Sequence, residues 1–323
     1  MERKSTTMLP ERIGYLDCLR LWAMTGVIVI HQAATGYSTA AAGSTDWAVC
    51  LLYSTLARFS VPVFVMISGA VFLDPQKPAA LAQMLPRIGR LAVLFLCWSM
   101  FYALPQTLAE CGSLVPDQLL LRLLKGHYHM WYLHLMMVLY LLTPLLRRET
   151  WRRILMPIAF LLGFGAAVLP GVPVWWSDIA YLGYYCLGHR LHNMKHSGKR
   201  TRGLMVASLA FLATAAVFCL AAERPELIFR ETTPHILMLS TAVFLLAKDS
   251  CHGVPSWTDK IVSCGRGIYL IHPVFNFLLR RAGLYALTFG PVISVALCSL
   301  LVGAMSYAAV RTMKGFPFLR HFV

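Results

Sequence analysis

The chain is 323 residues long, with 58% apolar residues, 13% charged residues and a mean hydropathy of +0.63. Soluble domains average about 45–50% apolar and about 25% charged residues, so this composition excludes an ordinary globular or disordered chain. The formal net charge is nevertheless +15. On a soluble protein this excess indicates a polyanionic partner such as nucleic acid, whereas on a membrane protein it reflects cytoplasmic loops rich in Lys and Arg.

Apolar stretches of a length suited to crossing a bilayer recur along the whole chain. Because backbone polar groups inside a bilayer need internal partners, these stretches predict an all-α, polytopic helical bundle with about ten transmembrane helices, forming one integral-membrane domain over 1–323. In chain order the stretches are 16–37, 48–73, 88–108, 131–146, 154–170, 175–192, 203–222, 232–247, 261–279 and 290–310. In the connection 109–130, Pro116 and Asp117 indicate the start of a short interfacial helix.

The basic residues are distributed unevenly between the connections. Of the 29 Lys and Arg, 22 fall in alternate connections that include both ends of the chain, and 6 fall in the others. This bias predicts that both termini are cytoplasmic, and it explains the net charge without a nucleic-acid partner. The first 15 residues carry no apolar core of a signal peptide, so we expect no cleavage.

The nine cysteines are never closer than 13 residues, so the sequence contains no CxxC redox pair or zinc knuckle. We therefore expect no metal. All fourteen carboxylates lie in predicted loops or at span ends, which argues against a cation- or proton-coupled transporter. Ionisable residues within spans are costly and are candidates for function; here they are Arg20, His31, Arg58, His134, His235 and His272.

Arg20 and His31 are eleven residues apart in the first predicted helix. Eleven steps of 100° end about 20° past three full turns, so both side chains project from one face, about 16 Å apart along the axis. A guanidinium binds phosphate in a bidentate geometry, and an imidazole acts as a base near neutral pH. The spacing alone also fits an Arg anchored to lipid phosphate and a His bonded to a neighbouring helix.

Arg58 falls near the middle of the second stretch, where a charge is tolerated only if it faces a cavity or a partner. A fixed positive charge there can polarise a reacting group or contact a substrate, so Arg58 is a candidate catalytic residue. The step Val61-Pro62 predicts a break in that helix.

The run from Tyr15 to His31 resembles the first helix of the membrane-bound acyltransferase family 3, whose signature is Arg, ten residues, then His. Further motifs follow in the order of that family, and together they cover nearly the whole chain. They are Arg58-Phe-Ser-Val-Pro62 with Ser68-Gly69, Arg87-x-x-Arg90 before Trp98-Ser99, His129-Met-Trp131-Tyr132 before Leu142-Thr-Pro144, and Gly267-Ile-Tyr269-Leu-Ile-His272-Pro273. The sequence is most similar in style to the O-acetyltransferases that include the enterobacterial common antigen enzyme. Some members carry Arg-x-Arg where this chain has Arg87-x-x-Arg90.

This resemblance implies ten core helices in a bacterial inner membrane and an acyl-CoA co-substrate, most often acetyl-CoA. It implies transfer to a hydroxyl of a carbohydrate or lipid-linked glycan. It also implies that His31 is the catalytic histidine and that Arg20, Arg87 and Arg90 bind the donor. We assign acceptor binding to His129, Trp131, Tyr132, Tyr269 and His272. Aromatic rings stack on sugar faces, and a belt of interfacial aromatic residues explains the first three equally well.

The sequence does not decide between two mechanisms, and it leaves two other classes of function possible. His31 acts either as a general base or as the carrier of a transient acyl-imidazole, and we favour the base. The acceptor can be met on either side of the membrane. The alternative functions are an exporter of an anionic lipid or glycan intermediate and a catalytically inactive sensory bundle.

Overall fold

The computed structural model describes residues 13–76, 81–169, 171–195, 197–221, 225–228, 230–252 and 255–323. All regular structure in these ranges is helical, with twelve α-helices and three short 3₁₀ segments. Five residues of the charge count, Arg3, Lys4, Arg12, Lys77 and Arg224, lie outside the described residues.

Each predicted apolar stretch coincides with a helix or with a pair of consecutive helices. The helices are α1 Gly14–Tyr37, α2 Thr45–Ala57, α3 Ser60–Phe72, α4 Leu81–Cys111, α5 Pro116–Lys125, α6 Trp131–Leu146, α7 Glu149–Val168, α8 Ala180–Asn193, α9 Gly198–Ala221, α10 Pro234–Ser250, α11 Ser256–Arg281 and α12 Pro291–Gly315. The short helix expected at Pro116 is α5. Proline opens it because the first turn of a helix does not need the missing N–H group.

Six helical segments of the described chain are long and apolar enough to cross a membrane: Thr45–Phe72, α4, α7, α9, Trp257–Arg281 of α11, and α12. The apolar helix α6 is shorter. These segments indicate a multi-pass membrane protein. The number of ten crossings and the cytoplasmic position of both termini stay predictions.

The second predicted span is divided into α2 and α3, and the position of the division corrects the sequence prediction. The break lies at Arg58 and Phe59, and not at Val61-Pro62. Pro62 falls in the first turn of α3, where a proline removes no intrahelical hydrogen bond. Arg58 caps the end of α2.

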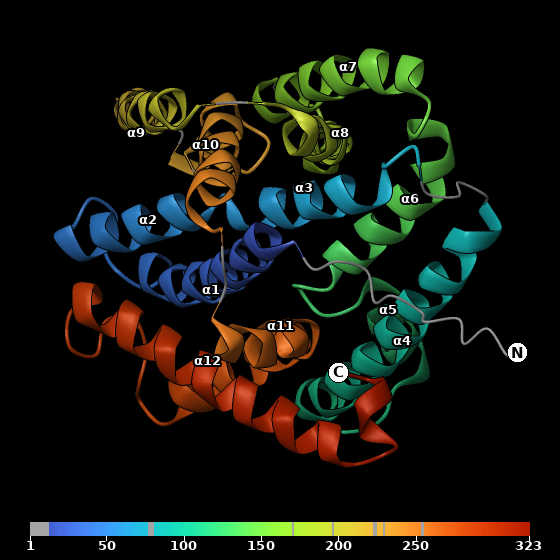
Figure 1. Ribbon diagram of the computed structural model, residues 1–323. Helices are drawn as coiled ribbons and strands as arrows, with labels where there is room; N and C mark the ends of the chain where they lie inside the picture. The colour runs from blue at the N-terminus through green and yellow to red at the C-terminus, as the bar shows by residue number, and fades with distance from the viewer. Residues whose placement is uncertain are drawn as a thin grey trace, which may run out of the picture.

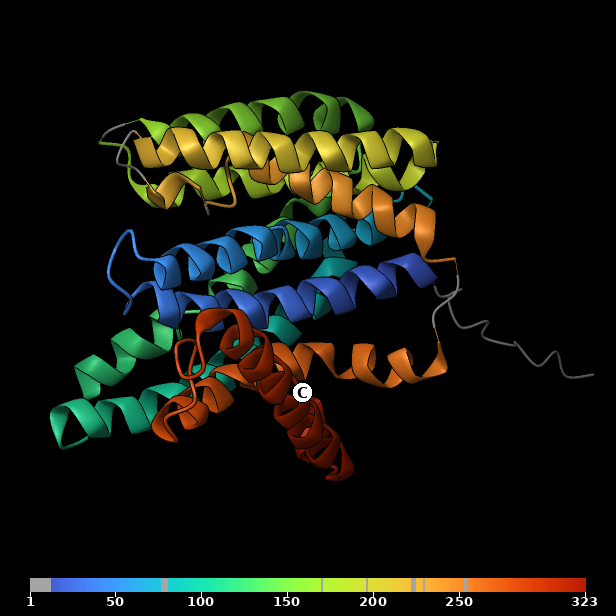
Figure 2. The same cartoon turned by 90° about the vertical axis from the view of Figure 1, so that its left-hand side faces the viewer.

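The helix α1 is the centre of the bundle and packs against α2, α3, α10, α11 and α12. Helices α7 to α10 lie on one side of α1 to α3, and α11 and α12 lie on the other (Figures 1 and 2). We call the end at which α1 begins the N-terminal face. Because Tyr15 contacts His192, this face also holds the end of α8. The opposite face holds the end of α1 and the start of α2.

Helices α3 and α8 approach so closely that their backbones touch. A Cβ atom added to Gly69 would lie 1.8 Å from the carbonyl oxygen of Tyr185, and one added to Gly188 would lie 2.0 Å from that of Met66. Small residues permit such close approach of helices in membranes, where apolar side chains gain little by leaving lipid. The two glycines therefore fix the distance between α3 and α8.

Candidate active site

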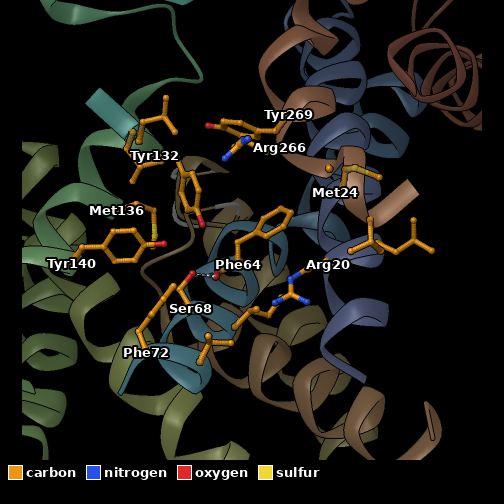
Figure 3. Close-up of a pocket in the computed structure, with 17 residues that line it drawn as sticks. Arg20, Met24, Phe64, Ser68, Phe72, Tyr132, Met136, Tyr140, Arg266 and Tyr269 are labelled. Carbon is orange, nitrogen blue, oxygen red and sulfur yellow. Dashed lines mark hydrogen bonds between the residues drawn. The ribbon is translucent and has the colours of Figure 1, made fainter. Parts of the chain in front are cut away.

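A cavity of about 360 Å³ lies between α1, α3, α6 and α11, and we call it the α1–α11 cavity. Figure 3 shows side chains from these helices pointing into a common space. Most of the lining is apolar or aromatic, including Met24, Phe64, Phe72 and Met136, and two cations, Arg20 and Arg266, also line it. The cavity thus joins a long apolar interior to fixed positive charge.

The sequence-predicted Arg20 reaches this cavity and forms an ion pair with Asp17, one turn earlier in α1. The Asp17 side chain is only 3% exposed, so it holds the guanidinium from the protein side. The Arg20 side chain is 37% exposed and is therefore accessible to a ligand. A guanidinium anchored in this way is preorganised to bind an anion.

Three further arginines lie around the cavity. Arg266 donates from Nη2 to the main-chain oxygen of Val323 over 2.9 Å, and Arg90 directly precedes Leu91, which lines the cavity. The guanidinium carbon of Arg87 lies 5.3 Å from the ring centre of Phe72, which lines the cavity. The sequence assigned Arg87 and Arg90 to the donor but missed Arg266. Its position inside the predicted span 261–279 was the signal that could have found it.

The cavity ends at two aromatic residues, Tyr132 and Tyr269, which we call the tyrosine layer. Their ring centres are 5.6 Å apart, and the Tyr269 hydroxyl donates to the carbonyl oxygen of His129. His31 does not line the cavity. The ring centre of Tyr269 lies 6.1 Å from that of His272, whose ring centre lies 5.1 Å from that of His31, so the cavity lining is linked to the predicted catalytic histidine through His272.

Behind this layer lie four histidines, His31, His127, His129 and His272, which we call the histidine cluster. The ring centres of His31 and His272 are 5.1 Å apart, and those of His129 and His272 are 5.5 Å apart. His127 and His129 approach to 3.2 Å between their Nδ1 atoms. Residues from α1, from α11 and from the loop 126–130 are thus brought together.

The hydrogen bonds of His272 define which of its nitrogens is available. Its Nδ1–H donates to the carbonyl oxygen of Tyr269 over 2.7 Å, so the neutral ring carries its lone pair on Nε2. Nε2 is buried and has no hydrogen-bond partner among the described residues. His31 is half-buried, and its side chain also makes no hydrogen bond within the described chain. Two imidazoles of the cluster thus keep a nitrogen without a hydrogen-bond partner among the described residues.

The two loop histidines have pKa values below the usual value for histidine. Burial lowers the pKa of His127 to about 4. Burial, followed by the neighbouring His272, also lowers the pKa of His129. Both rings are therefore neutral near pH 7, and they add no positive charge beside His31.

Arg58 has a partner that the sequence did not predict. Its Nη1 forms an ion pair with Glu231 over 2.7 Å, and the two side chains are only 14% and 18% exposed. Nη2 also donates to the Ser54 hydroxyl over 3.3 Å. The guanidinium is therefore held on two sides, by a carboxylate and by a hydroxyl.

The other candidate residues divide between the site and the protein core. Tyr132 and Tyr269 form the tyrosine layer, and His129 and His272 belong to the histidine cluster. Trp131 packs against Tyr181, with ring centres 5.5 Å apart, and the structure does not bring it to the cluster. His134 packs on Phe95 at 4.1 Å, and Nε2 of His235 bonds the carbonyl of Ile228.

The site thus combines apolar spanning helices, a cavity lined by arginines and a cluster of histidines. The sequence profile described as an acyltransferase domain matches residues 13–309. Since the match spans most of the chain, the protein belongs to acyltransferase family 3, and this supports a membrane acyltransferase. No curated protein and no solved structure matches the chain.

Proposed function

We propose that the protein is an O-acyltransferase of the bacterial inner membrane that transfers an acetyl group from acetyl-CoA to a hydroxyl of a carbohydrate or lipid-linked glycan. The enterobacterial common antigen O-acetyltransferases are the group it resembles in style. One observation carries the proposal: the α1–α11 cavity begins among arginines and ends at the tyrosine layer, directly before His272 and His31.

The cavity has the two properties that a CoA thioester requires. The phosphates of CoA are strong acceptors for arginine, and Arg20 and Arg266 line the cavity with Arg87 and Arg90 close by. The pantetheine arm is long and narrow, and the apolar lining of Phe64 and Met136 suits it. In this arrangement the thioester lies against Tyr132 and Tyr269.

The chemical step needs a base, and His31 supplies it. The acceptor hydroxyl oxygen attacks the thioester carbonyl carbon while His31 takes the hydroxyl proton. The carbon–sulfur bond then breaks, and His31 returns the proton to the CoA sulfur. General-base catalysis of this kind contributes about 10²–10⁴-fold. The Nε2 atom of His272 accepts a hydrogen bond from the acceptor and orients it.

The tyrosine layer adds a requirement to this mechanism. His31 does not line the cavity, whereas Tyr269 does and contacts His272 of the histidine cluster, so the thioester reaches His31 only after side chains such as Tyr269 move aside. Movement of side chains that completes a catalytic site is a common source of control in enzymes. We therefore assign Tyr269 the task of positioning the thioester, in addition to the acceptor role expected from the sequence.

The experiment is acetyl-CoA binding to the purified protein, measured by calorimetry, together with turnover. Loss of a charge-assisted hydrogen bond costs about 1.5–3 kcal/mol, so Arg20→Ala and Arg266→Gln are each expected to weaken binding about tenfold or more. His31→Ala is expected to keep binding and to lose about 10²–10⁴-fold in turnover. Arg153→Gln is the control, because Arg153 pairs with Glu149 and does not line the cavity.

Two results contradict the proposal. If folded wild-type protein does not bind acetyl-CoA, the exporter and the sensory bundle become the better explanations. If a labelled acyl group is trapped on His31 along the reaction path, the general-base role of His31 is wrong.

A further inference from the structure

A second pocket, of about 410 Å³, lies on the opposite face of the protein and is separate from the α1–α11 cavity. We call it the α4–α5 pocket because those two helices and the loop 126–128 form it. Helices α4 and α5 lie at the flank of the bundle (Figures 1 and 2). The polar and aromatic side chains that line it include Tyr102, Gln106, Gln118, Arg122, His127 and Tyr128.

This pocket reaches the histidine cluster from the side away from the donor. Tyr128 lines the pocket, is 55% exposed, and its ring centre lies 5.0 Å from that of His31. His127 also lines the pocket, stacks on Tyr102 at 4.3 Å and contacts His129. A ligand in the α4–α5 pocket therefore lies one ring away from the base.

The lining has the chemistry of a site for a saccharide that itself carries a negatively charged group. Aromatic rings pack on sugar faces, and the side-chain amides of Gln106 and Gln118 offer both donors and acceptors. Arg122 and Lys125 add two cations. Glu110 binds only the terminal nitrogens of Arg122, over 3.4 and 2.5 Å.

The Nε–H of Arg122 is an unused donor. It is buried and has no hydrogen-bond partner among the residues that the structure describes. A buried polar group of this kind is costly unless a ligand or water satisfies it. Glu110 holds the guanidinium of Arg122 in place and balances its charge. The positive charge of Lys125 is additional to this pair.

Leucines flank these cations on the same helix. Leu120, Leu121 and Leu124 of α5 are 57%, 60% and 64% exposed. An amphipathic helix of this type lies at the membrane interface, with its apolar side toward lipid chains. Leu121 also lines the pocket, so apolar surface, cations, and aromatic and amide groups lie next to one another there.

We propose that the α4–α5 pocket is the acceptor site and that its ligand is a saccharide attached to a lipid through a phosphate. The lipid chain lies along the leucines of α5, the phosphate binds Arg122 and Lys125, and the sugar occupies the space beside Tyr128 and His127. The inference rests on the proposed function. It adds that donor and acceptor enter from opposite faces.

The test measures binding of a prenyl-phosphate-linked N-acetylhexosamine to the full-length protein in nanodiscs. Two probes are compared with it: free N-acetylhexosamine 1-phosphate and an uncharged alkyl N-acetylhexosaminide. The lipid-linked phosphate is expected to bind at least tenfold more tightly than either probe. Arg122→Gln and the exposed Lys125→Gln are each expected to weaken it about tenfold, without changing acetyl-CoA binding.

Arg153→Gln is the matched control, because Arg153 also pairs with a glutamate over 2.5 Å but lies outside the α4–α5 pocket. Lys125→Gln keeps the test valid if Arg122→Gln fails to fold. Equal binding of the alkyl glycoside overturns the phosphate contact, and equal binding of the free sugar phosphate overturns the lipid contact. If acetyl-CoA binds but none of the three probes does, the acceptor site is wrong and the proposed function stands; loss of acetyl-CoA binding contradicts the function itself.

Discussion

The imidazole rings of His31 and His272 stack with their centres 5.1 Å apart and their planes inclined by 28°, although they come from helices at opposite ends of the chain. Helices α1 and α11 pack directly, and Gln32 donates to Asn276 over 2.7 Å close to the two rings in sequence. The pair is therefore fixed by helix packing and by a polar contact between the same helices.

The available nitrogen of His272 gives the first prediction. His272→Asn keeps a donor for the carbonyl oxygen of Tyr269 but removes Nε2. Loss of a hydrogen bond worth about 1–1.5 kcal/mol is expected to lower turnover roughly tenfold, with acetyl-CoA affinity and melting temperature close to wild type. Kinetics and thermal unfolding of the purified variant check this. Wild-type turnover in His272→Asn would show that Nε2 has no part in the reaction.

The ion pair of Arg58 and Glu231 gives the second prediction. Removing one partner leaves a buried charge, so Arg58→Gln or Glu231→Gln is expected to cost about 3–5 kcal/mol of unfolding free energy. The double variant is expected to lose less than the sum of the two, because no charge is left unpaired. Thermal unfolding in detergent measures the three. If the double variant is stable but still lacks turnover, Arg58 also serves catalysis, as the sequence predicts. If the two single losses of unfolding free energy simply add in the double variant, the ion pair is contradicted.

The contact of α3 with α8 gives the third prediction. Gly69→Ala would place a methyl group 1.8 Å from a backbone oxygen that cannot move alone, and overpacking of this kind costs about 1–3 kcal/mol or more. We expect a lower melting temperature and reduced yield of folded protein. Gly89→Ala is the control, since a Cβ there meets nothing within 4 Å. Equal stability of the two variants would disprove the close contact.

The loop histidine His127 gives a prediction about pH. Its pKa is about 4 in the folded protein, whereas an unfolded chain titrates near 6.5. Between these values the unfolded chain binds a proton that the folded protein does not, so stability is lost as the pH falls through this window. The melting temperature of His127→Gln is expected to change less than that of wild type between pH 7 and pH 4.5. His321→Gln, an exposed site, is the control, and parallel curves for all three proteins would contradict the burial of His127.

Much of the fold was predictable because helices in membranes are encoded locally. The stretch 131–146 coincides with α6 to the residue, and Arg147 and Arg148 bound its apolar run at the C-terminal end. The break between α2 and α3 was misplaced by a few residues because proline marks a helix start as readily as a break. The division of 175–192 into a 3₁₀ segment and α8 has no comparable local signal.

The site was predictable only in part. The apolar stretch correctly placed Arg20 and His31 in one helix. It could not show that Arg20 lines the cavity and His31 does not. The partner of Arg58, the position of Arg266 at the cavity and the entry of the loop 126–130 into the histidine cluster all depend on pairings between distant segments. Such pairings leave no periodic pattern in a single sequence.

The tyrosine layer has a consequence for the membrane as a whole. The α1–α11 cavity lies beside the arginines of the N-terminal face, and the α4–α5 pocket lies at the opposite face. The histidine cluster lies between the two. A continuous polar path between this cavity and this pocket would let protons and small ions leak and would discharge the electrochemical gradient of the cell. Under the proposed function, the packed rings of Tyr132 and Tyr269, the second of which donates to the carbonyl oxygen of His129, would act against such a leak while donor and acceptor are bound at opposite faces.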